Sequence, residues 1–316
     1  MPNRPLQVAI FGCPRSGTSW LGQLFNAHEA VAYRYQPLFS YEFKDWFGVH
    51  GVSAESLAAF GDALLGAQSD FVLQDLRPVK AGPPSHLVWK EVRYHQLMPA
   101  LAAQPGLHKL VYIHRPALDV INSWYQAPKE FRAGQDIHAE YLDAPSKNTD
   151  PCEYNGFNRW KASMALALAL KAAYPGRVVL VSYQRLRADP LAQLAALFAE
   201  MGLDLTDAVR SFVACSTIGN VFLLKGNTLI TPSRDQGILP GIMRRVVIEG
   251  ANECGLGVEE RHVGQHEIST ADGLFLTNSL RLLRPSPAHE VKDFHRLIGY
   301  ICRQIETQCG RDPRTL

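Results

Sequence analysis

Hydrophobic residues form short continuous runs along the chain, each bounded by turn or charged residues. Four of these runs cover residues 7–11 (QVAIF), 87–92 (LVWKEV), 109–114 (KLVYIH) and 177–183 (RVVLVSY). Runs of this length are typical of strands that are buried on both faces of a parallel sheet. The pattern therefore predicts at least four buried strands.

Between the runs, apolar residues recur with helical spacing. They do so directly after residue 18, in the alanine- and leucine-rich stretch 158–174, and over 191–201, where Pro190 stands near the expected start and Gly202 at the expected end. Strands that alternate with helices indicate an α/β domain, a parallel sheet flanked by helices.

The C-terminal part is expected to be helical. A last apolar stripe predicts a helix over 287–308, set off by Pro285 and Pro287. We therefore expect residues 1–258 to form the main domain and residues 259–316 a helical extension packed on it. Two polar, proline-bearing stretches of weak periodicity, 126–158 and 216–240, are expected to be lids or substrate loops.

Composition narrows the class of protein. A chain of 316 residues that is 47% hydrophobic can bury a large core, and a net charge of +2 gives no global basic field for nucleic acid. Six scattered cysteines without a CxxC pair are expected to be reduced. His262 and His266 are four apart, but the stretch HVGQH contains a glycine and no Asp, Glu or Cys, so we expect no metal site there. No stretch has the length of a signal peptide or membrane span, so we expect a cytoplasmic protein without a metal.

Residues 12–19 (GCPRSGTS) follow the first strand and open the first helix. Two glycines permit tight turns, and backbone N–H groups at a helix N-terminus attract anions. Arg15 is the cation of this loop, while Thr18 stands where a nucleotide triphosphatase has its lysine. The stretch predicts an anion site whose candidate ligands are Pro14, Arg15, Ser16, Gly17, Thr18 and Ser19.

Two motifs carry a family resemblance. GCPRSGTSWL resembles the 5′-phosphosulfate loop of sulfotransferases that use 3′-phosphoadenosine 5′-phosphosulfate (PAPS), in which Lys or Arg occupies the position of Arg15. LVYIHRPALDVINSWY resembles their 3′-phosphate element, with Arg115 at the strand end and Ser123 on the next helix. The resemblance implies a P-loop-type sheet, PAPS as co-substrate, sulfuryl transfer and no metal, with Arg15 neutralising charge on the transferred group.

Two further stretches resemble later parts of the same family. LVSYQRLRADPLAQLAALFAEMGL would place Tyr183 near the adenine, and the alternative is a strand-end tyrosine that packs on the next helix. PSRDQGILPGIMRRVVIEGANECGLG resembles the loop that closes over PAPS. It makes Ser233 and Arg234 candidates for covering the nucleotide, with Lys225 as a substitute.

The general base is the open question of the sequence. AHEAVAYRYQPLF resembles a segment that carries a catalytic glutamate before a proline in carbohydrate and tyrosylprotein sulfotransferases, but here Gln36 precedes Pro37. An amide cannot take up the proton, so Gln36 is expected to orient the acceptor or the sulfate. LVWKEVRYH resembles the strand whose lysine or following histidine approaches the sulfate, which gives Lys90 and His95. The candidate bases are His95 first, then Glu91, Glu42 and Asp45.

Together these features predict a PAPS-dependent sulfotransferase of bacterial type. The resemblance around Gln36 favours a hydroxyl acceptor on a small molecule or glycan, a carbohydrate or glycolipid. A P-loop nucleotide kinase or phosphotransferase is the first alternative, although it requires a lysine at position 18. A noncatalytic nucleotide-binding relative is the second, kept open by Gln36. Dimerisation through the C-terminal helix is also left open.

Overall fold

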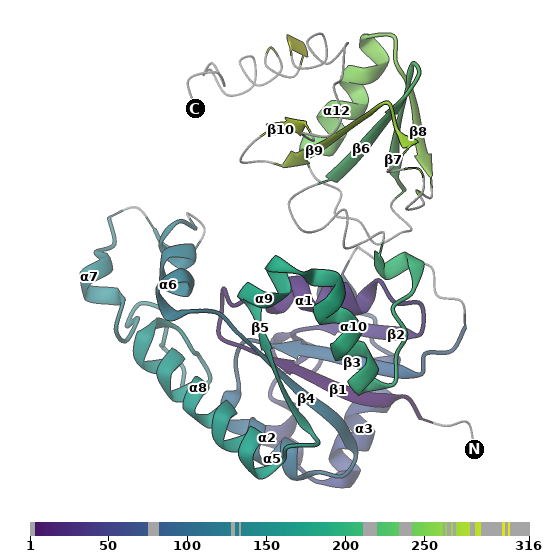
Figure 1. Ribbon diagram of the computed structural model, residues 1–316. Coiled ribbons are helices and arrows are strands. Elements are labelled where there is room, and N and C mark those ends of the chain that lie inside the picture. The colour runs from purple at the N-terminus through teal and green to yellow at the C-terminus, as the bar shows by residue number, and fades with distance from the viewer. Residues whose placement is uncertain are drawn as a thin grey trace. The chain divides into compact units, whose positions relative to one another are not determined.

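The protein divides into two compact units, residues Met1–Leu205 and Thr206–Leu316. The computed structural model describes residues 4–74, 82–127, 130–132, 134–210, 220–233, 242–261, 263, 267, 270–278, 282–285, 299–300 and 303. Figure 1 shows the ribbon of both units, which are described separately here.

The first unit contains a five-stranded parallel sheet with strand order β2-β3-β1-β4-β5. Its strands are β1 (Leu6–Phe11), β2 (Val31–Tyr35), β3 (His86–Glu91), β4 (Leu107–His114) and β5 (Val178–Ser182). The α/β class and the four strands expected from continuous apolar runs are confirmed. The apolar runs did not predict strand β2 (VAYRY), because several positions along it are only partly buried.

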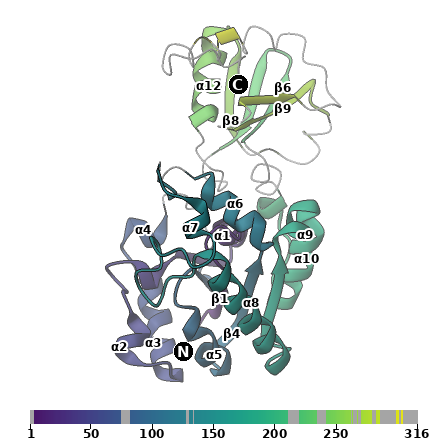
Figure 2. The same cartoon turned by 90° about the vertical axis from the view of Figure 1, so that its left-hand side faces the viewer.

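Helices cover both faces of this sheet (Figure 2). On one side lie α1 (Thr18–Asn26), α9 (Tyr183–Ala188) and α10 (Pro190–Met201), and on the other α3 (Ala54–Leu65), α5 (Met98–Ala103) and α8 (Gly156–Ala173). Shorter helices are α2 (Trp46–His50), α4 (Asp70–Leu73), α6 (Ala117–Tyr125), α7 (Ile137–Glu140), η1 (Pro37–Phe39) and η2 (His95–Leu97).

Side chains that alternate along the strands pack into two hydrophobic layers, one on each face of the sheet. Phe11 of β1 packs with Phe60 of α3 in the core on one face, and Trp89 of β3 contacts both rings edge-on. On the other face, Phe25 of α1 meets Phe198 of α10 with ring centroids 5.0 Å apart. Since successive strand residues point to opposite faces, a run that is apolar throughout serves both layers.

The second unit is a five-stranded mixed sheet with strand order β10-β9-β6-β7-β8. It consists of β6 (Asn220–Lys225), β7 (Thr228–Pro232), α12 (Ile242–Glu253), β8 (Gly257–Arg261), β9 (Gly273–Asn278) and β10 (Leu282–Pro285). Strands β6 and β7 form a hairpin whose turn contains Gly226 at φ +57°. Helix α12 connects the parallel strands β7 and β8.

Helix α12 holds this sheet through residues spaced four apart. Met243, Val247 and Ala251 are buried in one cluster with Phe222 and Phe275, whose rings stack 5.1 Å apart. This i, i+4, i+8 spacing places the three side chains on one face of the helix.

The structure differs from the expected division at 258/259. Residue 258 lies inside β8, and residues 259–261, 273–278 and 282–285 are strand instead of helix. Because β8 pairs with β7, a boundary there would cut a sheet in two. The stretch 216–240, expected to be irregular, includes β6 and β7. Most of the helix expected over 287–308 lies outside the described residues.

Three further findings concern the described residues alone. No helix among them is long and apolar enough to cross a membrane. No group of three His, Cys, Asp or Glu side chains in the described ranges could hold a metal ion, and His262 and His266 lie outside those ranges. Cys13, Cys152 and Cys254 are free thiols.

Candidate anion-binding site

The loop between β1 and α1 has a backbone that its glycines make possible. Gly17 has φ +95°, and a Cβ there would lie 2.5 Å from the ring of Tyr183. A Cβ on Gly12 would lie 2.5 Å from the carbonyl oxygen of Ile113. Arg15 also has a positive φ, +68°, which is uncommon for a residue other than glycine. The Ser16 N–H donates to the Cys13 carbonyl at 3.1 Å and closes the turn.

A cavity of about 590 Å³ opens beside this loop, which is a volume ordinary for a small-molecule site. Residues at or beyond the carboxyl ends of the five parallel strands line it: the loop after β1, Gln36, Lys90, Arg115 and Tyr183. Carboxyl ends of parallel strands meet at one edge, which is where open α/β sheets bind ligands. The sheet thus brings together candidates that lie far apart in the sequence.

The charge of the lining is strongly positive. Among the described residues that line the cavity, five have basic side chains, namely Arg15, Lys90, Arg93, Arg115 and Lys147, and two have carboxylates, Glu130 and Glu153. Aspartate does not occur in this described lining. An excess of cations in a concave site concentrates anions, so the cavity suits a ligand with several negative groups.

The two predicted phosphate motifs adjoin each other. Arg15 Nε donates to Ser123 Oγ at 3.2 Å, and Arg15 Nη1 lies 3.1 Å from Glu130 Oε1. Arg115 Nη1 donates to the Arg15 carbonyl at 3.4 Å, and its Nε lies 3.9 Å from Asp119. These contacts of Arg115 are long, which leaves its guanidinium able to bind a ligand phosphate.

Three aromatic side chains line the same cavity, Trp20, Tyr35 and Tyr183, and two of them are in contact. The rings of Trp20 and Tyr183 meet edge-on with centroids 5.7 Å apart, and the Arg115 guanidinium lies 4.8 Å from the centre of the Tyr183 ring. Tyr183 therefore packs on neighbouring side chains and also presents a surface to the cavity, where a flat base could stack.

Lys90 is a buried lysine whose side chain lines the cavity. Its Nζ lies 4.1 Å from the centre of the Tyr35 ring. Burial lowers the pKa of Lys90, the neighbouring Glu91 opposes that change, and Arg93 adds to it. A bound anion would favour the charged form of this amine.

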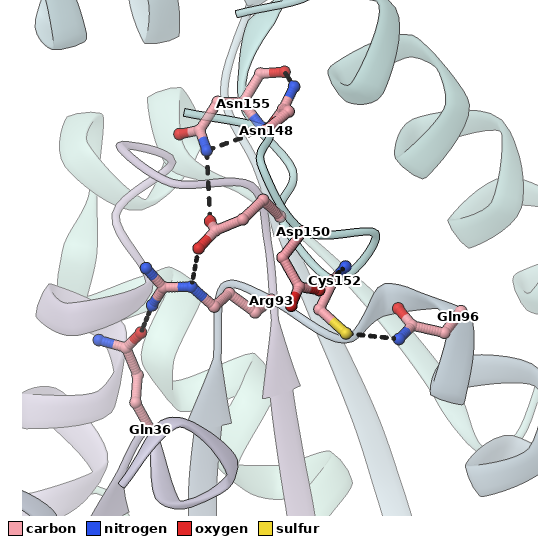
Figure 3. Close-up of polar contacts among 8 residues, drawn as sticks. Gln36, Arg93, Gln96, Asn148, Asp150, Cys152 and Asn155 are labelled. Atoms are coloured by element: carbon pink, nitrogen blue, oxygen red, sulfur yellow. Dashed lines mark hydrogen bonds and ion pairs between the residues drawn. The ribbon is translucent and has the colours of Figure 1, made fainter. Parts of the chain in front are cut away.

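Gln36 is buried and has φ +39° at the start of η1. Its Oε1 accepts a hydrogen bond from Arg93 Nη1 at 3.3 Å (Figure 3). Arg93 Nε in turn donates to Glu153 Oε1 at 2.6 Å, and its guanidinium covers the Phe39 ring at 3.8 Å. One guanidinium therefore connects the glutamine to a carboxylate from another part of the chain.

His95, the first candidate for the base, does not line the cavity. It is fully buried, Nδ1 lies 2.5 Å from Ser163 Oγ, and its ring stacks on Tyr154 with centroids 4.1 Å apart. Burial lowers the pKa of His95 to about 3, so the ring is neutral near pH 7. This environment is that of a structural histidine, and His95 has no access to the cavity that would let it act as the base.

The other candidate bases also lie outside the lining. Glu91 is fully buried and accepts the Leu38 N–H at 2.7 Å, away from the cavity side of Lys90. Glu42 accepts two backbone N–H groups at the start of α4, and Asp45 precedes α2.

The candidates for covering the nucleotide belong to the second unit. The Ser233 N–H donates to the Arg261 carbonyl at 3.2 Å, beyond the end of β7. Arg234 lies outside the described residues. Lys225 is exposed at the β6–β7 turn. The role of these three residues in covering the nucleotide stays a prediction.

Several lining residues were not singled out from the sequence. Arg93 follows β3 two residues after Glu91, and the others come from the stretch 126–158 that was expected to be a substrate loop, namely Glu130, Lys147, Glu153 and Asn155. Weak periodicity marked that stretch as functional, but nothing in the pattern showed which side chains would turn toward the cavity.

The fold and the cavity define an α/β protein with an anion site at the carboxyl edge of its parallel sheet. The chain belongs to the sulfotransferase family, whose model matches residues 7–207. This match coincides with the first unit and contains all the lining residues of the cavity.

A second family model, class IV aminotransferases, matches residues 158–287. The chain is 41% identical over 73 residues to an aminodeoxychorismate lyase of Bacillus subtilis, covering 23% of this chain and 25% of the relative. It is 49% identical over 63 residues to a probable branched-chain-amino-acid aminotransferase of Thermotoga maritima, covering 20% and 23%. A solved putative branched-chain aminotransferase from Thermotoga maritima superimposes with a TM-score of 0.27 and 32% identity over 31% of this chain and 40% of that one, too low a score to place the fold.

The chain thus spans about a quarter of the length of the curated relatives it matches. Both matched families are enzymes, and their matches overlap over residues 158–207. That overlap contains α8, β5, α9 and α10, and β5 pairs with β4 of the parallel sheet. Almost all of the overlap therefore lies in the first unit, and the rest of the aminotransferase match, residues 208–287, lies in the second unit.

The aminotransferase match implies pyridoxal phosphate, which enzymes hold through a lysine Schiff base. Such a lysine is reactive when a partly apolar pocket removes its charge. Lys225 is the lysine in the described part of the second unit, and it is exposed at a hairpin turn. The described residues do not fit the cofactor, and no aminotransferase step is derived for this unit.

Proposed function

We propose that the first unit transfers a sulfuryl group from PAPS to a hydroxyl acceptor. The observation that carries this proposal is the set of cations around one cavity, from the loop after β1 and from β3 and β4, in a chain that belongs to the sulfotransferase family. PAPS carries a 5′-phosphosulfate and a 3′-phosphate, so two anion subsites are needed. Arg15 and Arg115 supply one cation for each.

The residues of the site fit this co-substrate. The Ser16 hydroxyl is buried in the loop without a hydrogen-bond partner in the described structure, which makes it a donor that a bound oxyanion would satisfy. Ser123, which now accepts from Arg15, can turn its hydroxyl to a phosphate. Tyr183 and Trp20 offer rings against the base. The anion would replace Glu130 as the partner of Arg15.

When bound, PAPS supplies the sulfur that an acceptor oxygen attacks in line. Arg15 and Lys90 then neutralise charge on the sulfuryl oxygens and on the phosphate oxygen that leaves. Gln36, held by Arg93, is placed to orient the acceptor or the sulfuryl group by hydrogen bonds. Lys90 in particular is preorganised, since Tyr35 and its own burial fix the amine at the cavity wall.

A carbohydrate or glycolipid hydroxyl is the proposed acceptor. The segment that ends in Gln36-Pro37 supports this choice, because it resembles carbohydrate sulfotransferases, and Tyr35 and Gln36 line the cavity. An aromatic ring next to an amide is a surface on which a sugar can lie and donate hydrogen bonds.

The nucleotide kinase is less well supported by this site. Magnesium nucleotide sites use a lysine after the second loop glycine and a carboxylate for the ion. Here Thr18 follows Gly17, and the two described carboxylates of the lining are both paired with arginines.

Calorimetric titration separates the two functions. With adenosine 3′,5′-bisphosphate and with ATP plus magnesium as ligands, we expect the bisphosphate to bind at least tenfold more tightly, with no change on addition of EDTA. Tighter binding of ATP that EDTA abolishes would contradict the proposal. Release of bisphosphate from PAPS, assayed with a panel of glycosides, distinguishes an enzyme from a noncatalytic relative.

A further inference from the structure

Glu153 is a carboxylate of the cavity wall on the side of Gln36. Its side chain is 17% exposed, and it reaches the cavity from the segment between α7 and α8. The family resemblance places a base at position 36, where this chain has an amide. The proposed site therefore still needs a base, and a carboxylate close to position 36 would supply it.

Arg93 fixes the spatial relation of the two side chains. Its Nη1 donates to Gln36 Oε1 and its Nε donates to Glu153 Oε1, at 3.3 and 2.6 Å. Gln36 and Glu153 are therefore neighbours on a single guanidinium, although 117 positions separate them in the sequence. The carboxylate that position 36 lacks is therefore present on Glu153, which binds the same arginine as Gln36.

One carboxylate oxygen of Glu153 is held and the other is less engaged. Oε1 accepts the short bond from Arg93, whereas Oε2 has a contact of 3.4 Å with Asn155 Nδ2. The long contact can be exchanged for a better one at small cost. Glu153 is thus oriented through Oε1 while Oε2 can accept a proton from a ligand hydroxyl.

Hydrogen bonds hold the backbone that carries Glu153 on both sides. Asn148 and Asn155 bond each other through side chain and backbone, at 3.0 and 2.9 Å, and the Glu153 N–H donates to the Asp150 carbonyl at 3.0 Å. Tyr94, next to Arg93, donates its N–H to the Cys152 carbonyl at 3.0 Å. Such support preorganises a functional carboxylate.

Glu130, the second carboxylate in the described lining, has a different partner. It pairs with Arg15 of the loop, the cation proposed for the 5′-phosphosulfate. The Glu130 carboxylate would repel the phosphosulfate of PAPS, which must replace it as the partner of Arg15. Glu153 pairs instead with Arg93, which also holds the glutamine of the acceptor side.

We propose that Glu153 is the general base for the acceptor. This inference rests on the proposed function and deepens it. The acceptor oxygen forms a bond to sulfur as its proton passes to Glu153 Oε2, and the bond between sulfur and the 5′-phosphate oxygen breaks, with its electron pair leaving on adenosine 3′,5′-bisphosphate. Nothing is oxidised or reduced.

The variant Glu153→Gln tests the assignment. Because general base catalysis contributes about 10²–10⁴-fold, we expect kcat for bisphosphate release from PAPS to fall by at least about 100-fold. The Kd for adenosine 3′,5′-bisphosphate, measured by calorimetry and by tryptophan fluorescence, should stay within about threefold of the parent value. Glu200→Gln, the same change on the exposed face of α10, is the matched control and should leave both quantities unchanged.

The double variant Gln36→Glu with Glu153→Gln separates a base from a structural partner of Arg93. It keeps the net charge and one carboxylate on the same guanidinium, so it also covers the case in which Glu153→Gln alone does not fold. We expect it to recover at least tenfold of the lost kcat with bisphosphate binding intact. A folded, bisphosphate-binding double variant without recovery would overturn the assignment, as would Glu153→Gln with parental turnover.

A failure of the proposed function would give a different experimental result from a failure of the Glu153 assignment. If the parent protein neither binds adenosine 3′,5′-bisphosphate nor releases it from PAPS above the rate in buffer, both proposals fall. If the parent does both and Glu153→Gln does the same at equal rates, only the role of Glu153 is wrong.

Discussion

Replacement of Arg115 by alanine should abolish the preference of the protein for a 3′-phosphate. The guanidinium stands at the cavity wall with long contacts of 3.4 Å to the Arg15 carbonyl and 3.9 Å to Asp119, so its removal costs the fold little. A charge-assisted hydrogen bond to a phosphate contributes about 1.5–3 kcal/mol. At 1.4 kcal/mol per decade, the Kd for adenosine 3′,5′-bisphosphate should rise roughly 10- to 150-fold.

The assay is a calorimetric cycle with two ligands. Adenosine 3′,5′-bisphosphate and 5′-AMP are each titrated into the parent protein and into Arg115→Ala. Since 5′-AMP lacks the 3′-phosphate, its Kd should change by less than about threefold, and the ratio of the two Kd values should collapse in the variant. Arg187→Ala, which removes an exposed arginine from α9 outside the cavity, is the control and should change neither Kd.

Two results would refute the reasoning. An unchanged Kd for the bisphosphate in folded Arg115→Ala means that this arginine does not contact the 3′-phosphate. An equal loss for both ligands means that Arg115 acts by holding the loop through the Arg15 carbonyl, and the assignment of the 3′-phosphate subsite must move to another residue.

Three further predictions concern the loop, the buried histidine and the second unit. Gly17→Ala should weaken bisphosphate binding at least tenfold, because its Cβ would lie 2.5 Å from the Tyr183 ring at a φ of +95°; calorimetry that shows parental affinity would contradict this. His95→Gln should flatten the dependence of stability on pH between about 6.5 and 3. Burial depresses the pKa of His95 in the folded protein to about 3, so its stabilising contribution is complete above pH 6.5 and is lost as the pH falls. The free energy of unfolding of the parent should therefore fall by up to about 1.4 kcal/mol per pH unit in this range. Denaturant titrations at several pH values measure this slope in the parent and in the variant. Arg244→Met removes a buried guanidinium that bonds Glu260 at 2.6 Å and should destabilise the second unit by about 1–3 kcal/mol. All five tryptophans precede residue 206, so the circular dichroism transition should shift while the tryptophan fluorescence transition does not.

Local patterns predicted the first unit well, for physical reasons. Runs such as QVAIF and KLVYIH are apolar at every position because β1 and β4 are covered on both faces, and this leaves a signal that needs no knowledge of the partner strand. The loop between Gly12 and Gly17 was readable for a similar reason, since its backbone depends on glycines that the sequence displays.

The second unit was not readable in the same way. Its β6 (NVFLLK) and β7 (TLITP) lie within a stretch with glycine, proline and polar residues, which favoured an irregular segment. What makes them strands is pairing with β8 and β9, which follow later in the chain. Long-range pairing of this kind leaves only a weak local pattern.

The glutamine at position 36 shows why a residue type at one position is a poor guide to activity. Taken alone, Gln36 kept a noncatalytic relative open, because an amide cannot accept the proton. In the folded protein Arg93 binds both that amide and Glu153. The position of a carboxylate oxygen in the folded site, and not its position in the sequence, decides whether it can act as a base. The sequence could not show this pair, since Glu153 belongs to a segment of weak periodicity. Because the two side chains share one guanidinium, exchange of their residue types is the change that best separates a relocated base from a lost one.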